Sequence, residues 1–205
     1  VNDCSFHAHG NGTIGHMVST YAIRLYAWSA YAFCDDSLQS TMNGYFDVDS
    51  RFEWLDKIIR PKLLELKTLQ EKISFTEQAL LKRLSDVREN TVVNDTIQNI
   101  LINKGSLDIA KLAKKSFVST RQLERLFHEY VGITPKKLSN LIRYQFLWRD
   151  ILCEPDFDVL SAVYKFGYTD QSHLLREFKR YHSMDIHNAR IMAFKDVGNI
   201  QDVFV

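Results

Sequence analysis

The feature that most limits the fold of this chain is an internal repeat in its second half. Residues 112–127 recur at 163–178 when residue n is set beside residue n+51. The matched pairs are Leu112 with Val163, Lys114 with Lys165, Phe117 with Tyr168, Ser119 with Asp170, Leu123 with Leu174 and Phe127 with Phe178. A repeat at a fixed spacing predicts one supersecondary unit that occurs twice. Each copy has the pattern of a short helix, a tight turn and a second helix with an N-capping Ser119 or Asp170, which predicts a helix-turn-helix.

The remainder of this half is also predicted to be helical. The helices are expected at residues 93–103, 107–115, 119–130, 135–153, 158–166, 170–181 and 185–194, with Gly105, Gly132, Pro135, Pro155 and Gly167 in the gaps. Helix 135–153 would be about 28 Å long, at about 1.5 Å per residue. Since the DNA helix repeats in about 34 Å, two recognition helices held apart by such a rod would fit successive major-groove segments on one face of the duplex.

Two segments of this region resemble the two halves of the AraC/XylS DNA-binding domain. They are SxxQLxRLFxxxxGITP at 119–135 and FGYTDQSHLLREFKRY at 166–181, and the resemblance covers residues 93–193. It implies a mainly α fold, in which two helix-turn-helix subdomains are joined by a long linker helix. In that arrangement the DNA-binding domain is expected at 91–195, and residues 196–205 are expected to form a tail. Residues 1–90 would be a mostly helical N-terminal regulatory segment, truncated from a sensor or dimerisation domain.

The resemblance also implies which residues contact DNA. In the first recognition helix it assigns base edges to Arg121, Glu124 and Arg125, and positions nearer phosphate to Ser119, Thr120 and Gln122. In the second it assigns Asp170, Gln171, Ser172, His173 and Arg176. Phosphate contacts are assigned to Lys136, Lys137, Lys179 and Arg180. The chemistry is suitable, because Arg bonds guanine, Gln bonds adenine and Glu accepts from cytosine. As an alternative to base contact, Glu124 and Arg125 would be solvated or paired within the protein. The alternative for His173 is a capping or packing role in the second turn.

Three residues depart from the pattern of this family. Tyr164 stands where the family has a small alanine, so we expect crowding between the helices of the second unit. Ser183 and Ile186 occupy the positions that Gly132 and Pro135 hold in the first unit.

The first 90 residues are less informative. Residues 1–48 fit either strands or a buried helix. The capping-box pair Ser50 and Glu53 predicts a helix to about residue 66, and a second helix is expected at 74–87. A dense aromatic segment, with Tyr21, Tyr26, Trp28, Tyr31 and Phe33, could line a ligand pocket or form part of a core.

Composition and motifs exclude several other functions. Cys4, Cys34 and Cys153 form no CxxC motif, which favours a reducing compartment and leaves a nucleophilic, DNA-repair-type cysteine without an activating partner in sequence. Cys4 with His7, His9 and His16 suggests a metal site, but the spacing matches no standard zinc pattern. We therefore expect no catalytic residues, no cofactor and no metal. No apolar run is long enough for a membrane helix, so we expect a cytoplasmic protein. The first residue is Val1, which suggests that an N-terminal portion is missing.

Charge agrees with a nucleic-acid partner without requiring one. Residues 106–182 contain 13 Lys and Arg against 9 Asp and Glu, so the positive excess lies over the repeat. The main hypothesis is a sequence-specific transcription regulator that binds double-stranded promoter or operator DNA and responds to an effector or partner. A small-molecule effector, RNA polymerase and a second copy of the chain are the further candidate partners. The alternative is a helical protein–protein interaction module that keeps the fold without reading DNA.

Overall fold

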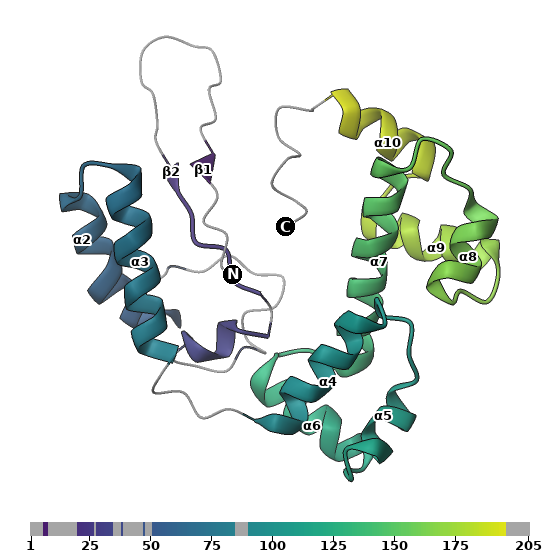
Figure 1. The fold of residues 1–205 in the computed structure, drawn as a ribbon, viewed down its shortest axis with the longest axis horizontal. Coiled ribbons are helices and arrows are strands. Elements are labelled where there is room, and N and C mark those ends of the chain that lie inside the picture. The colour runs from purple at the N-terminus through teal and green to yellow at the C-terminus, as the bar shows by residue number, and fades with distance from the viewer. Residues whose placement is uncertain are drawn as a thin grey trace. The chain divides into compact units, whose positions relative to one another are not determined.

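The structure is a computed structural model that describes residues 6–7, 20–26, 28–34, 38, 47, 51–84 and 90–195. These residues are mainly helical (Figure 1), which confirms the predicted fold class. They fall into two compact units, formed by residues 1–89 with 128–132 and by residues 90–127 with 133–205. Within the described residues, no helix combines the length and the apolar character that crossing a membrane requires.

The N-terminal unit contains two short strands and a helical pair. Strand β1, Phe6–His7, pairs antiparallel with β2, Thr20–Tyr21. A 3₁₀ turn at Ala30–Ala32 and a π-helical segment at Leu55–Ile59 precede α2, Arg60–Glu65, and α3, Leu69–Leu84. Residues 1–48 were expected to form either strands or a buried helix, and both described strands lie in this segment.

Helix α3 begins five residues earlier than predicted. The side chain of Glu71 accepts hydrogen bonds from the backbone N–H groups of Thr68 and Lys67, while the Thr68 hydroxyl accepts from the Glu71 N–H. This reciprocal pair is a capping box, which satisfies N–H groups that have no partner inside the helix. These hydrogen bonds hold the pKa of the Glu71 carboxyl below its usual range. The Ser50 half of the other predicted capping box lies outside the described residues.

The aromatic segment divides between a core and a partly exposed stack. Phe33 is buried with Ile59 and Leu80, and its ring stacks on that of Trp54 at a centroid distance of 6.2 Å. Tyr26 and Trp28 stack at 4.7 Å and remain partly exposed. The core interpretation is therefore confirmed for Phe33.

The C-terminal unit consists of seven helices among its described residues. They are α4 Thr91–Ile102, α5 Ile109–Lys115, α6 Thr120–Tyr130, α7 Pro135–Cys153, α8 Val159–Phe166, α9 Gln171–His182 and α10 Ile186–Lys195. Each lies within two residues of its predicted bounds, and α7 matches them. Helices α4 to α6 lie at one end of α7, and α8 to α10 lie at the other (Figure 1). Helix α7 thus connects the two helix-turn-helix units.

The repeat has a spacing of 50 residues over its first helices and 51 over its second helices. Asp108 and Asp158 cap α5 and α8, and the left-handed residues that follow these helices are Phe117 and Gly167. The caps of α6 and α9, Ser119 and Asp170, are 51 apart. The second turn therefore contains one extra residue. The predicted pairings of Leu112 with Val163, Lys114 with Lys165 and Phe117 with Tyr168 are therefore wrong by one position. They assume a spacing of 51 residues on both sides of the turn, whereas the first helices are 50 residues apart.

The turn after α4 is held against α7 by a close backbone approach. Gly105 has a φ of +74°, and a Cβ atom built on it would lie 2.1 Å from the Ser139 carbonyl oxygen. The Ser139 hydroxyl is buried and donates to the Gly105 carbonyl oxygen at 2.7 Å. Because only glycine fits such an approach, this contact fixes where α4 crosses α7.

The departures from the family pattern are accommodated without crowding. Tyr164 is 78% exposed, so the predicted crowding is wrong, while Ala162 on the opposite side of α8 is buried. Ser183 adopts the left-handed conformation at the end of α9, with a φ of +61°, as Gly132 does after α6. The backbone shape is therefore the same in both units even where the glycine is missing.

An aromatic cluster that contains His182 joins α9 to α7. The His182 ring lies 4.9 Å from Phe178 and 4.2 Å from Trp148, between centroids, and its Nδ1 is paired with the Tyr144 hydroxyl. Burial lowers the pKa of His182 and raises the pKa of Tyr144 to about 12. The neutral imidazole is therefore the form that the fold favours.

We expect the C-terminal unit to lose stability as pH falls from about 6.5, the ordinary histidine pKa, through the lowered pKa of His182. Over that interval the unfolded chain binds a proton that the folded chain resists, so the free energy of unfolding decreases. Urea unfolding of wild type and His182→Gln at pH 7.5 and 5.5 measures this. The advantage of wild type over the variant should shrink at the lower pH, and an equal difference at both values would contradict the assignment.

Candidate nucleic-acid interface

Helix α6 presents a polar face and buries an apolar one. Leu123 and Phe127 are fully buried, so the helix is fixed by its apolar side. Its first turn is capped by Ser119, whose hydroxyl accepts from the Gln122 N–H at 3.1 Å. The predicted contact residues of this helix are all exposed, namely Ser119, Thr120, Arg121, Gln122, Glu124 and Arg125.

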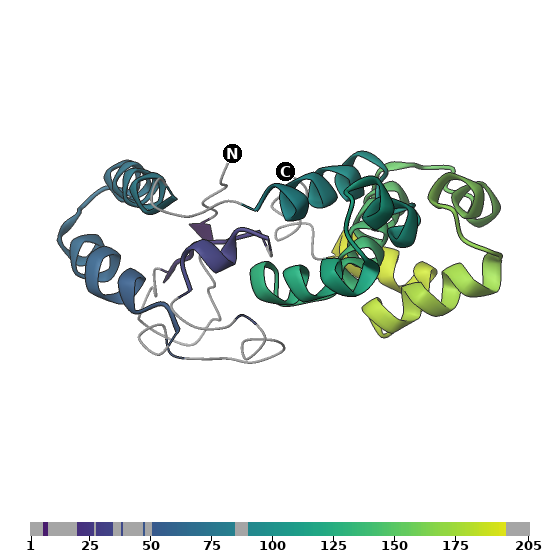
Figure 2. The ribbon, with the colours of Figure 1, turned by 90° about the horizontal axis from the view of Figure 1, so that it is seen from below.

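Helix α9 repeats this arrangement with a more basic outer face. Leu174 and Phe178 are fully buried at the positions equivalent to Leu123 and Phe127. The exposed predicted residues are Asp170, Gln171, Ser172, Arg176, Lys179 and Arg180. Among the described residues, no carboxylate forms an ion pair with Arg176. In Figure 2 both α6 and α9 lie towards the lower edge of the C-terminal unit.

Two predicted contact residues at the start of α9 have structural roles. The Asp170 carboxylate accepts from the His173 N–H at 2.7 Å and caps the helix. The His173 ring is half-buried, meets the Tyr168 ring edge-on at 5.3 Å, and places Nε2 3.9 Å from a Glu177 oxygen. This geometry matches the packing alternative for His173, and its contact with DNA stays a prediction.

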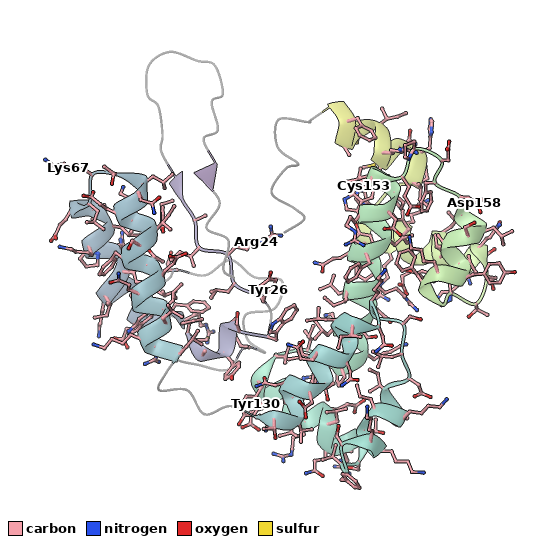
Figure 3. The ribbon with its side chains drawn as sticks, viewed as in Figure 1. Arg24, Tyr26, Lys67, Tyr130, Cys153 and Asp158 are labelled. Atoms are coloured by element: carbon pink, nitrogen blue, oxygen red, sulfur yellow. The ribbon has the colours of Figure 1, made fainter. Side chains whose placement is uncertain are left out.

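The remaining predicted residues begin α7. Lys136 and Lys137 are exposed in its first turn, after Pro135 and the capping Thr134. The Thr134 hydroxyl accepts from the Lys137 N–H at 3.1 Å. Helix α8, at the far end of α7, is capped by Asp158, which is labelled in Figure 3 together with Cys153 at the end of α7.

A buried ion pair that sequence reasoning missed anchors α9 to α7. Arg143 donates from Nη2 to both Glu177 oxygens, at 2.9 and 2.7 Å, and from Nε to Oε1 at 3.3 Å. Their side chains are 7% and 11% exposed. The Tyr168 hydroxyl donates to Glu177 at 2.9 Å, and its ring lies 4.2 Å from the Arg143 guanidinium carbon. Burial, and then the charge of Glu177, raises the pKa of Tyr168, so this hydroxyl remains a donor.

Two signals in the sequence point to this pair. Glu177 stands at the repeat position that Leu126 fills in α6, facing inward. Arg143 falls among the buried positions of α7, between Ile142 and Leu147. A charged residue at an apolar position indicates a buried partner, because an unpaired charge there is costly.

Of the four residues weighed as a metal site, Cys4, His9 and His16 lie outside the described residues, so the expectation of no metal stays a prediction. Cys34 and Cys153 are both free thiols.

Comparison with known proteins gives matches to the C-terminal region. Residues 112–190 match the family model described as a helix-turn-helix domain. An uncharacterized HTH-type transcriptional regulator from Haemophilus influenzae is 26% identical over 111 residues, which are 54% of this chain. The chain spans 36% of the length of that curated relative.

Two solved structures are similar to about half of this chain. The C-terminal domain of AraT, a response regulator from Geobacillus stearothermophilus, is 20% identical with a TM-score of 0.47, over 52% of this chain and 88% of that chain. A transcriptional regulator with an AraC-type DNA-binding domain, from Chromobacterium violaceum, is 20% identical with a TM-score of 0.44, over 49% of this chain and 90% of that chain.

The family match and the two units mounted on α7 define the class. Residues 112–190 thus form a helix-turn-helix domain, with one helix-turn-helix at each end of α7.

Proposed function

We propose that the chain is a sequence-specific transcription regulator that places α6 and α9 in adjacent major-groove segments of promoter DNA. The observation that carries the proposal is the repeated geometry. Two capped helices, each fixed by two fully buried apolar residues, present polar outer faces from opposite ends of α7. Two such helices, held apart by the 19 residues of α7, would enter successive major-groove segments on one side of a duplex.

The exposed faces of α6 and α9 differ in charge, which indicates different contributions to DNA binding. On α9 the exposed charged residues are Arg176, Lys179 and Arg180, which are all positive. On α6 the exposed Arg121 and Arg125 are offset by Glu124 and Glu129. We therefore assign most of the electrostatic attraction to α9 and to the lysines at the start of α7. A basic α9 favours DNA over the alternative of a protein-interaction module, for which an acidic or apolar face would be expected.

The finer part of the proposal concerns regulation. Residues 1–90 would respond to a small-molecule effector or pair with a second copy of the chain, and residues 91–195 would bind DNA and contact RNA polymerase. The separate core around Phe33, Ile59 and Leu80 supports an N-terminal unit with a function of its own.

Selection of bound sequences from a random DNA pool tests DNA reading. The recovered motif should contain two short blocks about one helical turn, or 10–10.5 base pairs, apart. Binding of the selected site should weaken steeply with salt, because lysine and arginine displace counterions from phosphate. A pool that yields no enriched sequence, or binding that is insensitive to salt, would contradict the proposal. Enrichment of a single block would show that one unit alone reads bases.

A further inference from the structure

The turn between α5 and α6 keeps a phenylalanine where its backbone favours glycine. The Phe117 N–H donates to the Lys114 carbonyl oxygen at 3.2 Å, and the Val118 N–H donates to the Ala113 carbonyl oxygen at 3.1 Å. This pair of hydrogen bonds is a Schellman motif, which needs a left-handed residue and usually has glycine there. Phe117 occupies that position with a φ of +55°.

The second unit contains the same motif with the expected residue. Gly167 donates to Tyr164 and Tyr168 donates to Val163, with a φ of +65° at Gly167. For a residue with a Cβ atom, the left-handed conformation is sterically unfavourable. The two turns therefore have the same backbone hydrogen bonds and the same left-handed conformation. Only in the first does a side chain, that of Phe117, disfavour this conformation.

The fold gives Phe117 no compensation for this strain. Its side chain is 97% exposed, so it contributes nothing to the core. Strained residues that packing does not explain are concentrated at functional sites. A large apolar ring held in water on a fixed turn is suited to contact with a partner.

The surroundings of Phe117 indicate which partner. Lys114 and Lys115 precede it and are exposed, and Thr120 and Arg121 are exposed just after it, at the start of α6. An aromatic ring beside cationic side chains suits a surface where the C–H groups of deoxyribose and the thymine methyl groups lie beside phosphates. The turn also leads directly into the proposed recognition helix.

We propose that Phe117 is a non-ionic DNA contact of the first helix-turn-helix unit, with its ring against deoxyribose or a thymine methyl group and with Lys114 and Lys115 beside neighbouring phosphates. This inference rests on the proposed function. It gives the first unit, whose α6 face has balanced charge, an attraction for DNA that salt does not screen.

Phe117→Gly should move stability and binding in opposite directions. The variant relieves the backbone strain, so its midpoint of thermal unfolding should rise. Its affinity for the selected DNA site should fall about tenfold, which is the order of effect of losing one aromatic contact with a nucleic acid. The full chain is titrated with the selected duplex at several salt concentrations. The loss should be similar at each of them, because the contact is uncharged.

Three variants serve as controls. Ser183→Gly relieves the same kind of strain after α9 and should gain stability with unchanged affinity. Phe117→Trp should retain affinity. Lys115→Gln should lower the slope of log affinity against log salt by about one unit, as expected for one lost phosphate contact.

The outcomes separate the two proposals. If wild type selects no DNA site, the proposed function fails. If wild type binds its site and Phe117→Gly binds it equally well, the assignment of Phe117 to DNA is overturned while the function stands.

Discussion

Replacing Arg143 with alanine is expected to destabilise the C-terminal unit by about 3–5 kcal/mol, the usual effect of removing one partner of a buried ion pair. The Glu177 carboxyl group would remain at 11% exposure with Tyr168 as its main remaining donor. Urea unfolding monitored by tryptophan fluorescence measures the change, since Trp148 lies in the same core.

Two comparisons show whether the effect belongs to the pair. Arg149→Ala removes an arginine from the same helix, but its side chain is 41% exposed, so the change should be below about 1 kcal/mol. The double variant Arg143→Met with Glu177→Gln removes both charges and keeps an acceptor for Tyr168. It should be more stable than Arg143→Ala. Equal losses in Arg143→Ala and Arg149→Ala would show that the pair does not anchor α9.

Replacing Arg176 with alanine is expected to weaken binding of the selected DNA site by about 5- to 150-fold, which corresponds to the roughly 1–3 kcal/mol of one bidentate base contact. Arg176 is exposed on α9, at the position that Arg125 holds on α6. It has no ion-pair partner among the described residues, so it is available to guanine. The measurement is a titration against the selected site and against sites changed at each base pair.

The pattern of losses distinguishes base reading from attraction to phosphate. Arg176→Ala should bind the selected site and one singly changed site equally, because the base that the arginine recognised no longer matters. Lys179→Ala, one turn further along α9, should weaken all sites alike and reduce the salt dependence. If Arg176→Ala behaves like Lys179→Ala, Arg176 contacts phosphate.

The sequence alone determined the local structure of the C-terminal half. Helix starts depend on the chemistry of a few adjacent residues, such as Asp158 before α8 and Pro135 at the start of α7, so they can be found without tertiary contacts. The apolar spacing in α6 and α9 likewise identified the buried faces and therefore the exposed ones. In α3 the signal at Thr68 and Glu71 was present in the sequence, and the predicted start at residue 74 overlooked it.

Tertiary structure decided the features that depend on distant residues. Arg143 and Glu177 are 34 residues apart, and their pairing follows from how α9 crosses α7. Whether Tyr164 crowds its neighbours depends on the rotation of α8, which turns it to solvent. The repeated helix-turn-helix is therefore a property of the sequence, because it is built from short-range patterns. The extra residue in its second turn and the left-handed Phe117 in its first could be located only once the backbone was fixed in space.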